Sequence, residues 1–201
     1  MITKEELSVR IKNACAEVIA AEAELTEIDS RFGDADHGFT MAKIAKTISE
    51  AIEEGDSIQE MLDNAGCAVM VLNGGSAVPL WNTWLDGLQE HSEAADSMTV
   101  EQVKSMFQGA YEELFEMSTA KVGDKTMMDA LIPATEAIQA WEGDMDGLFE
   151  AGAKAAEAGA ENSKNFVSKF GRAKSYGTQT IGTPDAGAVS MKYFFVGLAK
   201  K

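Results

Sequence analysis

Apolar residues recur at helical spacing along most of this chain. Thr3 and Glu6 form the residue pair of a capping box, and the apolar positions that follow at intervals of three, four and seven predict a helix to about residue 27. The same periodicity predicts further helices at about 39–54, 58–72, 79–90, 99–118, 126–141, 145–167 and 186–199. No stretch alternates as a strand does, so we predict an all-α fold.

Short turns join most of these helices, and short connections make sequential helices pack as antiparallel neighbours. We therefore predict a single domain, residues 1–201, built as an eight-helix antiparallel up-and-down barrel or bundle. In this arrangement alternate connections emerge at the same end. The connections 29–38, 73–79, 123–126 and 171–187 all contain glycine, and all but 73–79 also combine Asp with His, Thr, Lys or Arg.

All four of these connections belong to one end of the array, whereas plain acidic turns occupy the other end. This partition predicts one site built from four loops on a helical scaffold. A simpler explanation is that longer loops carry more turn-forming residues.

The composition is that of an ordinary globular protein, with 45% apolar and 25% charged residues. The net charge of -16 repels phosphate backbones and anionic lipid, so we expect neither nucleic acid nor a membrane as partner. No apolar run is long enough for a signal peptide or a membrane span, and we expect a cytoplasmic protein. Cys15 and Cys67 lack metal-ligand spacing and are expected to be buried free thiols.

Three carboxylates in the first glycine-containing loop are candidate metal ligands. In an extended conformation Asp34 and Asp36 lean the same way, and Gly33 lets the chain fold back toward Asp29. Converging carboxylates repel one another unless a hard cation such as Mg²⁺ lies among them, and a bound polyphosphate favours two such ions over one. Taken singly, each Asp is equally typical of a turn or a helix cap.

Other loops offer groups suited to phosphate, each of which also has an ordinary structural explanation. The turn at 73–76 precedes a predicted helix, and its backbone N–H groups are free to bind phosphate. Lys125 and Arg172 are the cations of the motif loops, and Arg172 suits a bidentate phosphate contact. His37 directly follows the aspartates, and Met127 could pack on the face of a base.

Five motifs in order along the chain resemble the L subunit of dihydroxyacetone kinase. They are Gly-Asp-Ala-Asp-His-Gly at 33–38, Gly-Gly-x-x-x-Pro-Leu at 74–80, Gly-Asp-Lys-Thr-Met at 123–127, Gly-Arg-Ala at 171–173 and Ile-Gly-x-x-Asp-x-Gly-Ala at 181–188. The resemblance implies an eight-helix barrel that binds ADP or ATP through two Mg²⁺ ions at one end.

The resemblance also implies roles for individual residues. Asp29, Asp34 and Asp36 would bind the metal ions, and Arg172 and His37 would be the catalytic residues. The remaining nucleotide contacts would come from Gly38, Phe39, Thr40, Gly75, Ser76, Ala77, Thr126, Met127, Asp185, Ala186 and Gly187, together with His37 and Arg172.

The resemblance implies partners as well. These residues contain no K-type segment, so a separate K subunit would hold the ketose, and the nucleotide would be either exchangeable ATP or an ADP cofactor that a phosphocarrier M subunit rephosphorylates. A homodimer is also expected. The segments 76–78 and 174–180 depart from the family pattern, so the partner or the acceptor sugar could differ. The alternatives are an ATP-dependent kinase subunit for another small ketose, a nucleotide-sensing regulatory protein without transferase activity, and a purely structural helical bundle.

Overall fold

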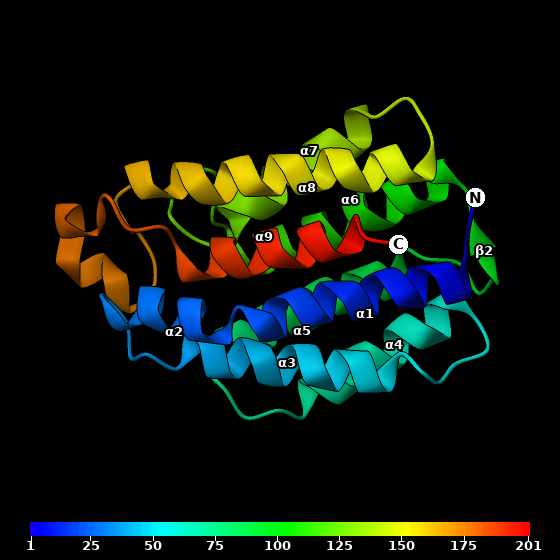
Figure 1. Cartoon of the computed structure of the whole chain (residues 1–201), viewed down its shortest axis with the longest axis horizontal. Coiled ribbons are helices and arrows are strands. Elements are labelled where there is room, and N and C mark those ends of the chain that lie inside the picture. The colour runs from blue at the N-terminus through cyan, green and yellow to red at the C-terminus, as the bar shows by residue number, and fades with distance from the viewer.

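A computed structural model describes every residue from Met1 to Lys201 and consists almost entirely of helices (Figure 1). The α-helices are α1 (Lys4–Ala20), α2 (Glu22–Ser30), α3 (His37–Ala51), α4 (Ile58–Met70), α5 (Ala77–Glu90), α6 (Val100–Ser118), α7 (Met128–Ala140), α8 (Met145–Asn162) and α9 (Ala186–Leu198). Two 3₁₀ segments, η1 (Ser163–Asn165) and η2 (Arg172–Thr180), lie between α8 and α9. The strands β1 (Ile2–Thr3) and β2 (Ser97–Met98) pair antiparallel.

Two capping boxes are present, one of them the predicted box of Thr3 and Glu6. The Thr3 hydroxyl accepts the Glu6 N–H at the start of α1, and the Thr99 hydroxyl accepts the Gln102 N–H at the start of α6. In each box the side chain of the third helical residue accepts the N–H of the capping residue. These reciprocal bonds satisfy N–H groups that a helix otherwise leaves free at its N-terminus.

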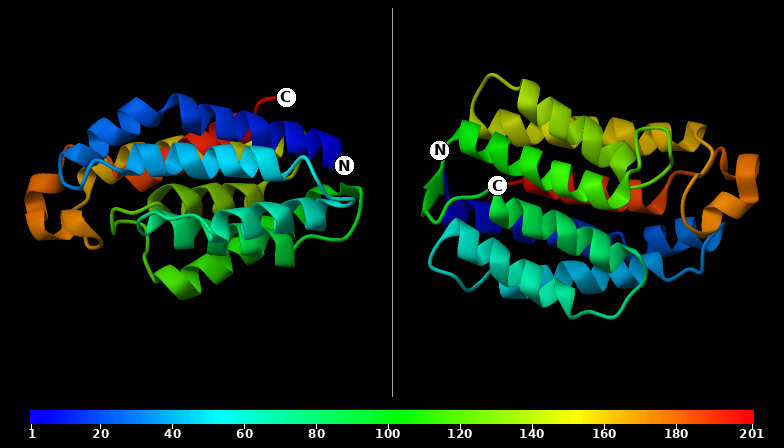
Figure 2. Two further views of the ribbon diagram at one scale, coloured as in Figure 1. Left: turned by 90° about the horizontal axis from the view of Figure 1, so that it is seen from below. Right: turned by 180° about the vertical axis from the view of Figure 1, so that it is seen from behind.

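The helices form a closed ring. Going round it, α1, α3, α4, α5, α6, α7, α8 and α9 each pack against the next, and α9 packs back against α1. The helix α2 continues the course of α1 toward the end of the barrel where η2 lies, and packs on α3 and α9 (Figures 1 and 2). The two chain termini lie at the opposite end (Figure 1).

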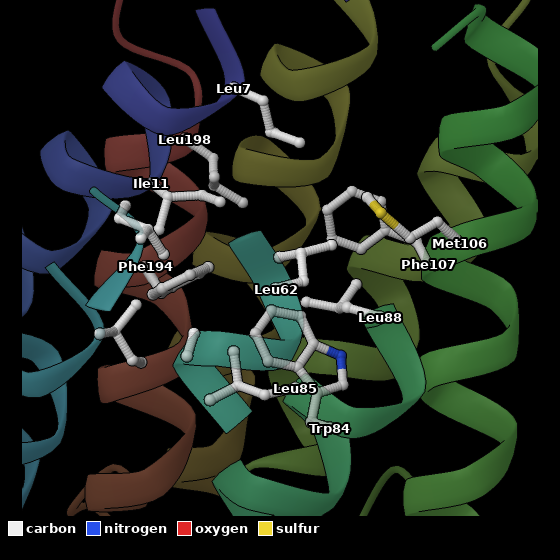
Figure 3. A pocket seen from close by; sticks show the side chains of 13 residues that line it. Leu7, Ile11, Leu62, Trp84, Leu85, Leu88, Met106, Phe107, Phe194 and Leu198 are labelled. Carbon is white, nitrogen blue, oxygen red and sulfur yellow. The ribbon is translucent and has the colours of Figure 1, made fainter. Parts of the chain in front are cut away.

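A single hydrophobic core fills the ring. Trp84 is its centre, with edge-to-face contacts to Trp81 and Phe194 at centroid distances of 5.5 and 5.4 Å. The core leaves an apolar cavity of about 20 Å³ bounded by Trp84, Leu88 and Phe194 among other side chains (Figure 3). A cavity of this size without polar lining stays dry, so the barrel interior is a packed core.

Four sequence predictions need correction. The first predicted helix is interrupted at Ala21, so the chain has nine α-helices and Asp29 lies in the last turn of α2. The predicted helix at 145–167 ends at Asn162, and the segment 172–180 is 3₁₀-helical where no helix was expected. Cys67 is exposed on the outer side of α4, where its sulfur lies 3.9 Å from Asp63, and only Cys15 is buried.

No helix in the structure has both the length and the apolar character required to cross a membrane.

Candidate functional site

The four motif loops meet around one cavity of about 500 Å³ at the η2 end of the barrel. Its walls include the C-terminal end of α2, the first turns of α3, α5 and α9, the loop before α7, and the segment that joins α8 to α9. The convergence of these loops is the arrangement that the alternation of the helices predicts. Of the predicted site residues, only Gly38 and Phe39 lie outside the cavity wall.

Asp29, Asp34 and Asp36 converge at the mouth of this cavity. One oxygen from each carboxylate lies within 4.8 Å of the other two. The Asp29 carboxylate accepts the N–H groups of Asp36, at 3.2 Å, and of His37, at 3.4 Å, which folds the loop back onto the end of α2. A cluster held by its own backbone in this way exists before any ligand binds.

Two unusual backbone positions allow this convergence. A Cβ at Gly33 would lie 2.0 Å from Oδ1 of Asp29, so glycine is required there. Ala35 has φ 61°, in the left-handed region that non-glycine residues seldom adopt. The expectation that Asp34 and Asp36 lie on an extended segment is therefore wrong, because a left-handed turn at Ala35 brings them together instead.

The electrostatics of the cluster favour a cation. Partial burial and the nearby Asp34 and Asp29 carboxylates raise the pKa of Asp36. The positive charge of Arg172 opposes this increase. The only cation paired with the cluster is Arg172, whose guanidinium lies 2.7 Å from Asp34. Three carboxylates with oxygen as the sole donor type match the preference of Mg²⁺ and Ca²⁺, so these residues fit a hard divalent ion.

The N-terminus of α5 provides free N–H groups inside the cavity. Ser76 precedes the helix without making a side-chain cap, and neither its N–H nor that of Ala77 has an acceptor within the chain. A Cβ at Gly74 would lie 2.6 Å from Val78 and 3.1 Å from Thr40, so this turn packs directly on the start of α3. Free N–H groups at a helix N-terminus suit an anion.

The His37 imidazole is held between α3 and α9. Its Nε2 lies 2.7 Å from the Ser190 hydroxyl, which itself donates to the carbonyl of Ala186. Burial lowers the pKa of His37. The nearby Asp29 carboxylate and a hydrogen bond with the Ala186 backbone oppose this decrease. A neutral ring engaged on this side is suited to fixing the start of α3 against α9.

The two residues that follow His37 point elsewhere. A Cβ at Gly38 would lie 2.2 Å from the carbonyl oxygen of Glu22, so Gly38 allows α3 to approach α2 closely. The Phe39 side chain is 65% exposed on the outside of the cavity. The next residue, Thr40, is buried and returns to the wall.

The loop before α7 and the first turn of α9 form the deeper wall. Met127 and Gly187 lie side by side there, since a Cβ at Gly187 would lie 3.4 Å from that of Met127. Asp185 caps α9 by accepting the N–H of Ala188 at 2.8 Å. Burial raises the pKa of Asp185 to about 7, with a further contribution from Asp129, although Lys125 and backbone N–H groups oppose the shift.

The segment between α8 and α9 lies at the end of the barrel (Figure 1), and its residues 170–173 line the cavity. Its η2 part is the segment 174–180 that departs from the family pattern, extended at its start by Arg172. Tyr176 packs on Phe32 of the aspartate loop, with ring centroids 5.2 Å apart. Gly171 and Gly177 have φ values of 60° and 55°, which turn the chain at the start and in the middle of η2.

Sequence reasoning assigned no site role to several residues that build this cavity. Asp129, fully buried, accepts the N–H groups of Gly123 at 2.6 Å and Thr126 at 2.7 Å and so shapes the loop before α7. Asp129 lies in the first turn of the predicted helix at 126–141, where Asp commonly accepts backbone N–H groups, and this position is the sequence signal that could have identified it. Phe32 and Ser168 also line the wall, and no sequence signal marks either of them.

Comparison with known proteins gives concordant similarities. The DAK2 domain model matches residues 31–200. The chain is 31% identical over 192 residues to the ADP-binding subunit of the PEP-dependent dihydroxyacetone kinase of Escherichia coli, covering 92% of this chain and 91% of that one. It is 33% identical over 193 residues to D-erythrulose kinase of Mycolicibacterium smegmatis, covering 92% of this chain and 33% of the relative.

The fold is also that of a solved kinase. The structure superposes on the dihydroxyacetone kinase of C. freundii in complex with AMP-PNP and Mg²⁺ with a TM-score of 0.73 and 23% identity. That match covers 96% of this chain and 33% of the other. The chain therefore spans almost the whole of the E. coli subunit but about a third of the M. smegmatis and C. freundii kinases.

Proposed function

We propose, from the premise that this chain belongs to the DAK2 domain family, that it is the nucleotide-binding subunit of a kinase for small ketoses. The observation that carries this proposal is the convergence of three carboxylates at a cavity that also contains the first turns of α5 and α9. Carboxylates attract cations, whereas the free N–H groups at a helix N-terminus attract anions. A site that combines them suits a polyphosphate bound together with divalent cations.

The metal ions would be held by Asp29, Asp34 and Asp36. Mg²⁺ bound there would neutralise the nucleotide phosphates and the charge that develops during phosphoryl transfer. Three clustered carboxylates and a polyphosphate together carry enough negative charge to support two ions. The C. freundii kinase, whose structure is a complex with AMP-PNP and Mg²⁺, is consistent with this combination of nucleotide and metal.

The phosphates would lie between the aspartate loop and α5. The free N–H groups of Ser76 and Ala77 would donate to phosphate oxygens, with Gly75 leaving room for close approach. Thr40 and Arg172 would add side-chain donors from the two flanking elements. Because the backbone N–H groups are fixed before the ligand arrives, little backbone rearrangement opposes binding.

The base would contact the deeper wall. Met127 is buried and polarisable, and it lies beside Gly187 in the cavity wall. Thr126, Asp185 and Ala186 complete that wall. A flat apolar contact with a few polar groups at its edge is typical of nucleotide base sites.

For catalysis we propose that Arg172 stabilises charge on the transferred phosphoryl group. It is the cation that pairs with the aspartate cluster, and it lies on the segment that lines the mouth of the cavity. We assign His37 a positioning part, because its ring is held by Ser190 and its pKa is lowered. The base that accepts the proton of the attacking hydroxyl would then come from the ketose-binding partner.

A separate K-type chain would present the ketose at the open end of the cavity. Large exposed apolar side chains concentrate at this end of the barrel, as expected of a docking surface. They are Phe39, Met70, Val71, Met117, Val122, Phe170, Tyr176 and Ile181.

Similarity to a subunit of the PEP-dependent kinase of E. coli supports a PEP-dependent system, in which a phosphocarrier M subunit would rephosphorylate bound ADP. The homodimer stays a prediction.

Reconstituted turnover tests this proposal. The chain is mixed with a K-type chain and either dihydroxyacetone or erythrulose, and the phosphoryl donor is ATP in one series and PEP with phosphocarrier proteins in the other. Phosphorylated ketose is followed by ³¹P NMR. We expect product in the PEP series with the wild type and none with Asp34→Ala, whereas absence of product in every combination would contradict the assignment to a kinase.

A further inference from the structure

Lys125 is a buried lysine in the loop before α7, with only 4% of its surface exposed. Its Nζ donates to three backbone carbonyls, those of Ser163 at 2.7 Å, Phe166 at 3.1 Å and Thr183 at 2.6 Å. An ammonium group has three N–H donors, so all of them are used. Although Lys125 lines the cavity, it has no donor left for a phosphate.

The three carbonyls belong to the two roots of one segment. Ser163 and Phe166 lie just after α8, and Thr183 lies just before the Asp185 cap of α9. Between these roots the chain runs out to form η2 and carries Arg172 to the mouth of the cavity. A single ammonium group therefore ties both ends of this segment together and to the loop that carries Met127.

The burial of this charge is compensated by its surroundings. Burial lowers the pKa of Lys125, and the nearby carboxylates of Asp185 and Asp129 oppose that shift without cancelling it. The backbone of Lys125 is itself fixed, with φ 61° in the left-handed region and with the neighbouring Thr126 N–H bound to Asp129. The backbone of the loop is thus held in place, and the ammonium group that it carries contacts both roots of the segment.

We propose that Lys125 is a positioning residue that clamps both roots of the segment 166–183 and thereby sets where Arg172 stands over the cavity. The part of this inference that concerns the nucleotide rests on the proposed function. The clamp itself is a property of the protein without any ligand. A lysine that only stabilised the fold would raise the unfolding temperature without any specific link to Arg172.

Hydrogen exchange of the ligand-free protein tests the clamp. Lys125→Met keeps an unbranched side chain that is one atom shorter and removes the donors. We expect amide exchange across 166–183 to become about tenfold faster or more, the effect of losing a hydrogen bond to a charged group, while the core of α5 stays protected. Lys125→Gln retains two donors and should give a smaller effect, so it replaces the Met variant if that protein does not fold.

Lys169 supplies a matched control. It lies on the same segment and pairs with Asp124 at 2.6 Å, but its side chain is 61% exposed. Lys169→Met removes the same charge from the same neighbourhood and should leave the exchange of the roots at 163–166 and 183 unchanged. Unchanged exchange across 166–183 in both the Met and the Gln variants of Lys125 would overturn the clamp.

A double-mutant cycle tests the link to Arg172. If Lys125 acts by placing Arg172, then Arg172→Gln should weaken ADP binding in the wild-type background and have almost no further effect in Lys125→Met. Additive losses would mean that Lys125 does not act through Arg172. If the wild type binds no ADP at all, the proposed function is wrong. The hydrogen-exchange experiment still tests whether Lys125 holds the roots of the segment 166–183, because it uses the protein without ligand.

Discussion

The guanidinium group of Arg172 lies 2.7 Å from the carboxylate of Asp34, which connects η2 to the aspartate cluster. The two side chains are 72% and 35% exposed, and ion pairs at such surface positions contribute about 0–1 kcal/mol. The pair can therefore exchange partners at little cost. With nucleotide and Mg²⁺ present, Asp34 would turn to the metal and Arg172 to a phosphate.

This relationship predicts opposite effects of one substitution. Arg172→Gln should weaken ADP binding by about tenfold or more, because a hydrogen bond to a charged group contributes about 1.5–3 kcal/mol. Binding of Mg²⁺ alone should be equal or tighter, since Asp34 loses its competing cation. Isothermal titration calorimetry measures both affinities. Arg31→Gln is the control, because Arg31 is exposed and pairs only with Glu27 at 3.2 Å; an Arg172 variant with unchanged ADP affinity would remove Arg172 from the phosphate side.

Two substitutions in the aspartate loop should have different effects on ADP binding. Gly33→Ala places a Cβ 2.0 Å from Oδ1 of Asp29, so we expect that carboxylate to move and metal-dependent ADP binding to be lost. Ala35→Gly relieves a left-handed conformation that costs roughly 1–2 kcal/mol, and binding should persist. Calorimetry and thermal unfolding distinguish the cases. Full binding by Gly33→Ala would mean that the geometry of Asp29 does not matter.

The stability of the protein should depend on the ionisation of Asp185. Its folded-state pKa is about 7 against an ordinary 3.8, so between these pH values the folded chain binds a proton that the unfolded chain has released. The free energy of unfolding contributed by Asp185 therefore falls as pH rises through that window. Asp185→Asn keeps an N-cap acceptor and cannot ionise, so it should raise the unfolding temperature by a few degrees at about pH 8 and hardly at all at about pH 4. An equal gain at both pH values would contradict this.

The exposed apolar side chains at the η2 end of the barrel should affect binding of the K-type chain and leave the affinity for ADP unchanged. Val71 is 75% exposed at that end, and Val9 is 49% exposed on α1, away from it. Val71→Asp should lower turnover with a K-type chain by about tenfold or more while ADP affinity stays the same, because a charge is introduced into a desolvated contact. Val9→Asp should change neither quantity. Equal turnover by the two variants would place the docking surface elsewhere.

Sequence patterns predict the parts of the fold and site that depend on local spacing. The capping boxes, the alternation of helix directions and the cluster of three aspartates within eight residues follow from neighbouring positions. The meeting of four loops at one end follows from counting helices, and the interruption at Ala21 does not disturb it, because α2 continues toward the same end as α1.

Other features depend on long-range contacts that leave little trace in local spacing. Lys125 finds its carbonyl partners 38 to 58 residues later in the chain, and nothing in the motif around it indicates that all its donors are used. The pairing of Phe32 with Tyr176 joins loops that are far apart in sequence. The exposure of Cys67 reflects which side of α4 faces the ring, and its small apolar side chain suits either side.

Nucleotide binding through metal held by the aspartate cluster is tested most directly by calorimetric titration of ADP with Mg²⁺ and with EDTA, for the wild type, Asp34→Ala and Asp56→Ala. Asp56 is an exposed aspartate in a loop at the opposite end and serves as the matched control. We expect binding by the wild type and Asp56→Ala that requires Mg²⁺ and is lost in Asp34→Ala. Binding that persists in EDTA, or in Asp34→Ala with Mg²⁺, would contradict a metal-bridged nucleotide site.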